Sequence, residues 1–400
     1  FATVNKDRIF FVCEDDIWSV SIKGGSAQRL TTGRGEFSMP RVSLDGKFVA
    51  FVGREEGHPE VFLIPAEGGL PKRLTYLGSD VLSVVGWSHD SKQIHFICDD
   101  RSAFFRATDA FTISARGGSP QCLKWGHVQS FDLKADGKVV LGRNACDPAR
   151  WKRYKGGTRG DIWIDSGGKG QFRRLTDLNG NLVWPMFIGE RIYFLSDHEG
   201  VGNLYSCQAD GSDLKKHTHQ KRYYVRFPSS DGKKIAYTAG GDVFIYDPDA
   251  DKEHKIEIKT PASTYQIQRK FVRAADYLEH YSPHPDGHSL ALIMRGQPLT
   301  LGNFEGPVLQ YGEGSRVRYR LCQCLPDGKR FLVVNDKDGY ERLELHHADQ
   351  SSAPQLISSE NIGRITDLAI SPDGNRVAVS NHKYELLILD IRKGKAKVLD

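Results

Sequence analysis

The sequence predicts an all-β protein made of β-propeller blades, and three observations support that prediction. An Asp-Gly dipeptide recurs along the chain at a spacing of about 40 to 55 residues, which is the length of one four-stranded blade. A short apolar strand follows each of these turns. A strand that ends in Arg-Leu-Thr closes several of the units. The repeat therefore indicates about nine blades.

The Asp-Gly pairs predict the hairpin that joins the first two strands of a blade. Asp and Gly tolerate the positive φ of a two-residue hairpin turn. Asp90-Ser91 and Gly189-Glu190 occupy the same place in two units, and Lys6-Asp7 opens the series. The Asp-Gly turns are Asp45-Gly46, Asp136-Gly137, Asp231-Gly232, Asp286-Gly287, Asp327-Gly328 and Asp373-Gly374.

The strands between these turns are short and rich in β-branched and aromatic residues. No segment shows a sustained helical period. One blade cannot bury both of its faces, whereas blades stacked around an axis can. The third strand repeats as Asp16-Ile17-Trp18, Asp161-Ile162-Trp163 and Asp242-Val243-Phe244, and the closing strand as Arg29-Leu30-Thr31, Arg73-Leu74-Thr75 and Arg174-Leu175-Thr176.

The regular spacing of the repeat is interrupted once, at residues 260–274, and this interruption predicts two domains. We expect residues 1–259 to form a complete six-bladed propeller, residues 260–274 to form a linker, and residues 275–400 to form the first three blades of a second propeller. Each of the first six units holds its four strands in chain order, so the first ring is expected to close by side-chain packing alone. Three blades are too few for a ring, since propellers hold about four to eight. The sequence thus indicates that the chain stops inside an incomplete second propeller.

Composition excludes several classes of function. The net charge is +5, and basic and acidic residues are mixed along the chain, which argues against a nucleic-acid partner. No apolar run approaches the roughly 20 residues that span a bilayer, so no membrane association is expected. Seven scattered cysteines argue against a disulfide framework and favour the cytoplasm.

No catalytic centre, metal site or cofactor site is expected in this chain. Asp165-Ser166-Gly167-Gly168 is similar to the nucleophile loop of trypsin-like proteases, but Ile164 precedes it and these are ordinary hairpin residues. The sequence contains no G-x-S-x-G, no phosphate-binding loop and no H-E-x-x-H. Cys322 and Cys324 supply only two of the about four ligands that a structural metal site needs.

A basic segment in the fourth unit is a candidate binding surface. Its cations could bind anionic groups such as peptide carboxylates. The alternative is an insertion that packs its aromatic residues, Trp151 and Tyr154, on a neighbouring subunit or domain. The five cations of this segment are Arg150, Lys152, Arg153, Lys155 and Arg159.

Two further arginines are candidates for the lining of a central channel. The first strand of each blade lines that channel. Arg41 and Arg226 lie in the predicted first strands of the second and sixth units. If their side chains face inward, the first ring has a basic lumen that favours the passage of peptides with free carboxylates.

Three segments resemble the tricorn protease family. They are Trp151-Lys152-Arg153-Tyr154 and the residues through Ile164, Gly189-Glu190-Arg191-Ile192-Tyr193-Phe194 and the residues through Gly200, and Asp210-Gly211-Ser212-Asp213-Leu214 and the residues through Thr218. Their order also matches, and the resemblance covers essentially the whole chain. Arg-Leu-Thr and Asp-Gly alone are also found in TolB-type propellers.

The resemblance implies a large cytoplasmic serine peptidase that trims oligopeptides downstream of the proteasome or similar proteases. It implies a six-bladed and then a seven-bladed propeller, followed by PDZ-like and catalytic domains, in a homo-hexamer. The propellers would route peptides, and the catalytic residues would lie outside this chain. The family's double-arginine loop, which anchors the substrate carboxylate, has no counterpart in residues 77–83.

Two other classes of protein compete with this interpretation. A free-standing TolB-like or WD-type propeller would act as a protein-binding module, and its chain would end with a closed ring. A prolyl-oligopeptidase relative would pair a single ring with an α/β-hydrolase domain. The broken second ring disfavours both.

Overall fold

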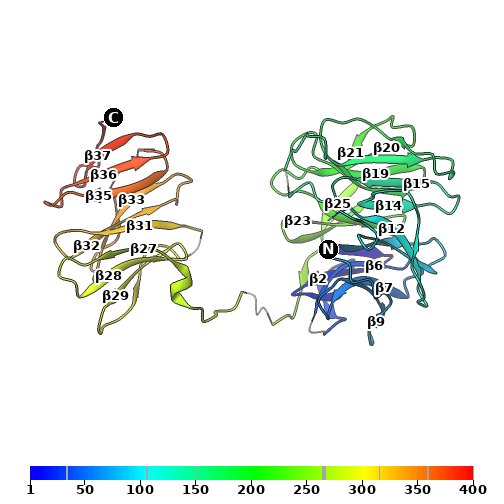
Figure 1. The fold of residues 1–400 in the computed structure, drawn as a ribbon, viewed down its shortest axis with the longest axis horizontal. Helices are drawn as coiled ribbons and strands as arrows, with labels where there is room; N and C mark the ends of the chain where they lie inside the picture. The colour runs from blue at the N-terminus through cyan, green and yellow to red at the C-terminus, as the bar shows by residue number, and fades with distance from the viewer. Residues whose placement is uncertain are drawn as a thin grey trace. The chain divides into compact units, whose positions relative to one another are not determined.

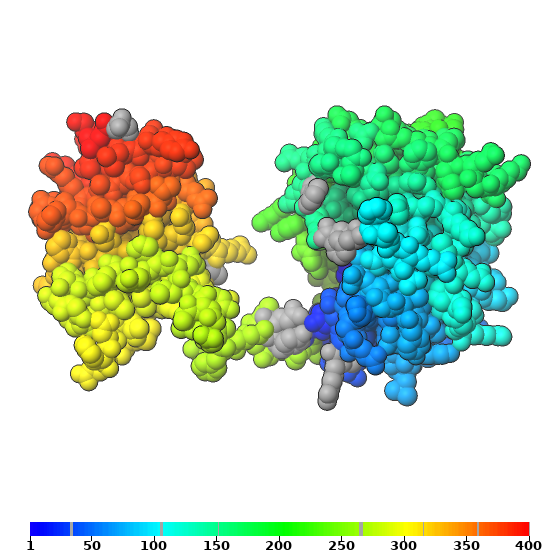
Figure 2. All heavy atoms as spheres, in the orientation of Figure 1, coloured from blue at the N-terminus to red at the C-terminus, as the bar shows by residue number. Residues whose placement is uncertain are grey.

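The computed structural model describes residues 1–32, 35–104, 107–150, 152–263, 267–314, 316–357 and 360–399. The chain divides into two compact units, Phe1–Gln268 and Arg269–Asp400, which are considered separately (Figures 1 and 2). Both units are built of antiparallel four-stranded sheets in which neighbouring strands follow chain order. This arrangement confirms the predicted all-β propeller fold. No helix in the described ranges is long and apolar enough to cross a membrane.

The first unit contains six four-stranded blades among its described residues. Their strands are β1 (Ala2–Asn5), β2 (Arg8–Cys13), β3 (Asp16–Ser21) and β5 (Gln28–Arg29); β6 (Glu36–Val42), β7 (Phe48–Arg54), β8 (Glu60–Pro65) and β9 (Lys72–Arg73); β10 (Leu82–Trp87), β11 (Gln93–Cys98), β12 (Asp109–Ser114) and β13 (Gln121–Cys122); β14 (Ser130–Leu133), β15 (Val139–Arg143), β16 (Asp161–Asp165) and β17 (Arg173–Arg174); β18 (Leu182–Ile188), β19 (Arg191–Ser196), β20 (Asn203–Gln208) and β21 (Lys215–Lys216); β22 (Arg226–Ser230), β23 (Ile235–Ala239), β24 (Asp242–Asp247) and β25 (Lys252–Lys255).

The Arg-Leu-Thr repeat ties the closing strand of a blade to its third strand. In the first blade, the Thr31 hydroxyl donates to Asp16 at 2.6 Å and accepts the backbone N–H of Ile17 at 2.9 Å. Arg29 Nε donates to the same carboxylate at 3.0 Å. The second blade repeats this arrangement around Glu60. The motif therefore satisfies a buried carboxylate and a strand-end N–H together.

The ring closes by more than the side-chain packing that the sequence predicts. Blades one and six share an apolar cluster that includes Val4, Phe11 and Ile245. In addition, β26 (Ile258–Lys259) pairs in parallel with β4 (Gly25–Ser26), which lies between β3 and β5 of the first blade in the chain. The expectation of packing alone is therefore wrong, because a short backbone ladder also joins the two ends of the ring.

The second unit contains three blades among its described residues. A short 3-10 helix, η1 (Ala274–Tyr277), precedes them. Separate apolar clusters fill the spaces between the first and second blades and between the second and third. The strands are β27 (Leu278–Pro283), β28 (Ser289–Met294), β29 (Gln297–Gly302) and β30 (Leu309–Gln310); β31 (Tyr319–Cys324), β32 (Arg330–Asn335), β33 (Arg342–His347) and β34 (Gln355–Leu356); β35 (Ile365–Ile370), β36 (Arg376–Asn381), β37 (Leu386–Asp390) and β38 (Ala396–Val398).

Candidate functional site

The first strands of the six blades enclose the axis of the first unit. Neighbouring first strands contact one another around the whole ring, from β1 through β6, β10, β14, β18 and β22 and back to β1. Because all blades have the same strand order, these strands run in the same direction. Their carboxyl ends therefore meet at one mouth of the axial passage and their amino ends at the other.

The mouth at the carboxyl ends, which we call the turn-side vestibule, is predominantly acidic. It is a cavity of about 500 Å³ that includes the hairpin turns of several blades. Its charged lining among the described residues consists of two basic and four acidic side chains. They are Arg41, Lys134, Asp132, Asp136, Glu190 and Asp231.

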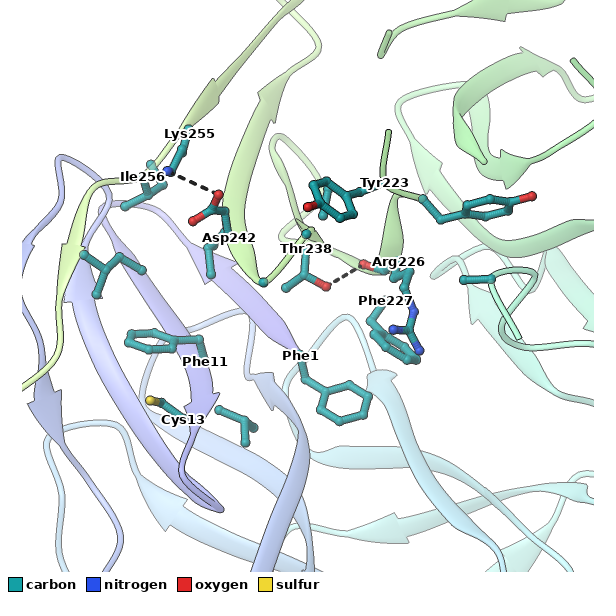
Figure 3. A pocket seen from close by; sticks show the side chains of 18 of the residues that line it. Phe1, Phe11, Cys13, Tyr223, Arg226, Phe227, Thr238, Asp242, Lys255 and Ile256 are labelled. Carbon is teal, nitrogen blue, oxygen red and sulfur yellow. Dashed lines mark hydrogen bonds and ion pairs between the residues drawn. The ribbon is translucent and has the colours of Figure 1, made fainter. Parts of the chain in front are cut away.

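The mouth at the amino ends, which we call the cap-side vestibule, is predominantly basic. It comprises two adjoining cavities of about 660 and 670 Å³, and Figure 3 shows the first of them. Within the described part of the chain, five basic and three acidic side chains line them. They are Arg150, Lys152, Arg222, Arg226 and Lys255, with Asp147, Asp242 and Glu257.

Residues 144–150 and 152–160, which we call the cap segment, follow β15 and precede β16 in the chain, and several of them line the cap-side vestibule. Asp147 forms an ion pair with Arg226 of β22. The Arg153 backbone N–H donates to Asp197 at 3.0 Å, and Asn181 donates to the Tyr154 carbonyl at 3.3 Å. The cap segment is therefore fastened to blades five and six, across the end of the passage.

An aromatic plug separates the two vestibules. Trp184 and Arg41 line the turn-side vestibule, whereas Phe227 and Phe1 line the cap-side vestibule. The Trp184 and Phe227 rings lie 6.4 Å apart, and the Phe1 and Phe227 rings lie 4.3 Å apart. Trp184 is only 4% exposed, and its indole N–H donates to the Cys146 carbonyl at 2.6 Å. The four side chains thus lie between the two vestibules.

Arg41 is a buried cation within this plug. Its guanidinium lies 5.4 Å from the centre of the Trp184 ring, and its Nε and Nη1 donate to the Val85 and Pro40 carbonyls. No carboxylate pairs with it among the described residues, and Nη2 has no hydrogen-bond partner there. Burial lowers the pKa of Arg41 to about 10. The plug therefore holds an uncompensated positive charge, which is costly without an anion or water.

An unusual backbone conformation recurs in three of the first strands. Met39, Trp184 and Phe227 have φ values of 50°, 55° and 50°, and a proline follows each of them. The register of the first strand shifts at each of these positions. Such bulges redirect side chains from the face that simple alternation assigns. The repeated X-Pro dipeptide in three inner strands was the sequence signal for the plug.

The structure brings some of the predicted cations together and separates others. Arg226, Arg150 and Lys152 line the cap-side vestibule, and Arg41 lies in the plug. Arg153 and Lys155 are exposed but line neither vestibule. Arg159 is held in ion pairs with Asp177 and Asp161. Trp151 lies outside the described residues. Sequence reasoning missed Arg222, Trp184 and Phe227.

Six closed blades around a divided passage, followed by three more blades, define a tandem β-propeller protein. A family model described as the tricorn protease N-terminal beta propeller domain matches residues 1–252. A second, described as the tricorn protease second beta propeller domain, matches residues 278–400. The chain therefore belongs to the tricorn protease family, and a free-standing TolB-like propeller is not favoured.

Similar proteins span the whole chain. A tricorn protease homolog from Saccharolobus solfataricus is 36% identical over 402 residues, which is 100% of this chain and 37% of that protein. The tricorn protease of Thermoplasma acidophilum is 30% identical over 99% of this chain and 37% of its own length. A crystal structure of the tricorn protease matches with a TM-score of 0.72 at 27% identity, covering 100% of this chain and 39% of that one. The chain thus spans little more than a third of these relatives.

Proposed function

We propose that this chain is the propeller region of a cytoplasmic tricorn-type serine peptidase that degrades oligopeptides downstream of the proteasome or similar proteases. Its catalytic and PDZ-like domains lie outside this chain, and the parent protein is a homo-hexamer. The six-bladed unit admits and channels peptides and supports assembly. Family membership supports the parent activity, and seven cysteines without a disulfide are in keeping with the cytoplasm.

The opposite charge of the two vestibules is the observation that carries the channel proposal. A free peptide has a carboxylate at one end and an ammonium group at the other. The basic cap-side vestibule suits the carboxylate, and the acidic turn-side vestibule suits the ammonium group. The first unit therefore selects short peptides with free ends and orients them along its axis.

The cap-side cations replace the arginine loop that this chain lacks. Residues 77–83 contain no arginine, and the backbone N–H groups of Leu77 and Gly78 are occupied by Glu60 at 2.8 and 3.1 Å. Arg226 and Lys255 are held in ion pairs. Arg150, Lys152 and Arg222 form no ion pair among the described residues. They are therefore available for an incoming carboxylate.

The plug makes the passage a gate. A peptide that enters either vestibule meets Trp184, Phe227 and Arg41 before it can reach the other. Passage requires these side chains to move, while binding to one vestibule does not. The carboxylate of a peptide at the plug would also compensate the buried charge of Arg41.

Peptide binding to the 400-residue chain tests the channel proposal. Fluorescence anisotropy would compare a labelled hexapeptide with its C-terminally amidated form at low and high salt. We expect the amidated peptide to bind about tenfold more weakly, and salt to reduce the difference. Equal affinities for both peptides would contradict carboxylate recognition and leave the family assignment intact.

The parent protein tests the peptidase proposal. We expect the protein purified from its native host to have a mass of roughly 100 kDa or more per chain, to form a particle several times larger, and to hydrolyse fluorogenic tripeptides by a serine mechanism, since the chain spans about a third of its relatives. A stable 45-kDa species without hydrolysis would instead favour a protein-binding module.

A further inference from the structure

The first hairpin turn of the second unit gathers two histidines around a carboxylate. The turn joins β27 to β28 and reads His284-Pro285-Asp286-Gly287-His288. One ring nitrogen of each histidine and one carboxylate oxygen of Asp286 all lie within 4.8 Å of one another. The two imidazole rings are stacked, with their centres 3.9 Å apart.

Other blades show what this turn normally contains. In the second and third blades of the first unit, a serine hydroxyl donates to the turn aspartate at 2.6 and 2.7 Å. A lysine two residues after that aspartate forms an ion pair with it, at 3.8 and 3.3 Å. The backbone turn is the same, because Gly287 N–H donates to the His284 carbonyl at 2.9 Å as Gly46 N–H does to Ser43. His284 and His288 thus replace the usual serine and lysine around the same carboxylate.

The His284 ring is fixed by the neighbouring blade. Its Nε2 lies 2.7 Å from the Gly328 carbonyl and donates to it, which leaves the lone pair on Nδ1. Gly328 has a φ of +65°, and a Cβ there would lie 2.7 Å from that Nε2. Only a glycine therefore leaves room for the ring. The His284 side chain is 10% exposed, so it is held in place before any ligand arrives.

We infer that this turn is a binding site for a divalent transition-metal ion such as Zn²⁺, with His284, Asp286 and His288 as ligands. Two imidazoles and a carboxylate are a donor set that Zn²⁺ prefers, whereas Ca²⁺ and Mg²⁺ prefer oxygen alone. Ligands of a tetrahedral zinc ion lie about 3 to 4 Å apart, so small side-chain rotations bring these groups into place.

The remaining metal positions face a cavity. His284 and His288 line a hollow of about 550 Å³ whose wall also includes Thr300 and Asp349. On binding, Nδ1 of His284 exchanges the Asp286 backbone N–H, which it now accepts at 3.1 Å, for the metal ion. Three protein ligands leave at least one position for water or a small anion.

Calorimetric titration of the 400-residue chain with ZnCl₂ tests this site. We expect one saturable site, weakened at least about tenfold by His284→Ser or by His288→Lys, which restore the turn of the other blades. His127→Ser is the matched control, since His127 lies 3.7 Å from Asp109 outside this cluster, and it should bind as the unmodified chain does. No saturable binding, or both turn variants binding like the unmodified chain, would overturn the inference.

A Co²⁺ spectrum gives a second measurement that does not depend on the variants folding. We expect the unmodified chain to develop visible absorption bands that saturate at one equivalent of Co²⁺, because imidazole and carboxylate ligands replace water around the ion. A spectrum that stays that of aqueous Co²⁺ at every ratio would equally overturn the inference.

Discussion

The two vestibules of the first unit are built from the same six strands, yet their charges are opposite. The hairpin turns of the repeat supply the turn-side acids Asp136 and Asp231. On the cap side, Arg150 and Lys152 come from the cap segment, which is a single insertion in one blade. The turn-side vestibule therefore takes its charge from the repeated hairpin turns. The cap-side vestibule takes much of its charge from the cap segment, which is not repeated in the other blades.

This difference shows how the two ends of a propeller built from one repeat can carry different charges. A ring of identical blades gives each mouth a charge set by its turns, and the turn residues Asp136 and Asp231 contribute acidic side chains to one mouth. One insertion then makes the other mouth basic without disturbing the blades, because loops tolerate insertions better than strands do. Because the plug lies between the two mouths, a substitution at one mouth leaves the lining of the other unchanged.

Removing the plug should have the largest effect. Trp184→Ala leaves a cavity beside the buried Arg41 and removes the hydrogen bond to Cys146, so we expect a loss of about 4 kcal/mol in the free energy of unfolding. Thermal and urea unfolding measure this loss. Phe104→Ala, which truncates an aromatic side chain that is 74% exposed, is the control and should change little.

A milder substitution at the same position tests the packing of the ring without leaving a large cavity. Trp184→Phe retains an aromatic ring against Phe227 but removes the indole N–H, and it should cost only about 1 kcal/mol. If Trp184→Ala were as stable as the unmodified chain, the ring would not be packed across the axis, and the division of the passage would be wrong.

Reversing charge at one mouth should have the next largest effect. The double variant Lys152→Glu, Arg222→Glu makes the cap-side vestibule acidic, and we expect a peptide with a free carboxylate to bind about tenfold more weakly. The double variant Lys155→Glu, Lys169→Glu reverses the same number of charges at exposed residues that do not line the vestibule, and it serves as the matched control. Anisotropy measures both, and equal losses in the two variants would show that net charge alone, rather than the vestibule, sets the affinity.

The blades and the plug were not equally predictable from sequence. The Asp-Gly and Arg-Leu-Thr elements repeat, so nine blades and the position of Arg41 in an inner strand followed from the pattern. The direction of the side chains did not follow, because bulges at Trp184 and Phe227 shift the strand register. The path of the cap segment depends on contacts such as Asp147 with Arg226, which join residues far apart in sequence.

Releasing Arg226 from its ion pair with Asp147 should slightly increase the difference in charge between the two mouths. Asp147→Asn removes the carboxylate that pairs with Arg226, so the cap-side vestibule gains positive charge. We expect peptides with a free carboxylate to bind about threefold more tightly, with a stability change below about 1 kcal/mol because Arg226 is 43% exposed. Anisotropy and thermal unfolding measure the two effects. Weaker binding would mean that Asp147 positions the cap segment more than it neutralises Arg226.

The smallest effect is expected from one acid of the turn-side vestibule. Burial raises the pKa of Asp132, although the Phe187 N–H donates to its carboxylate at 2.8 Å. The folded state therefore favours the protonated form, and this contribution to stability is present at low pH and is lost as pH rises through the raised pKa. Asp132→Asn stays neutral at every pH, and its one amide oxygen can accept from only one of the two N–H groups, those of Phe187 and Leu133, that donate to Asp132.

We therefore expect the change in Tm caused by Asp132→Asn to be about 2 °C more favourable at pH 7 than near pH 4. Asp136→Asn is the matched control with the opposite sign. Hydrogen bonds from Lys138 lower the pKa of Asp136, so its ionised form is favoured in the fold and its replacement should lower the Tm at pH 7. Differential scanning calorimetry at both pH values compares them. A change in Tm for Asp132→Asn that is equal at pH 7 and pH 4 would show that burial does not disfavour the ionised form of Asp132 in the fold.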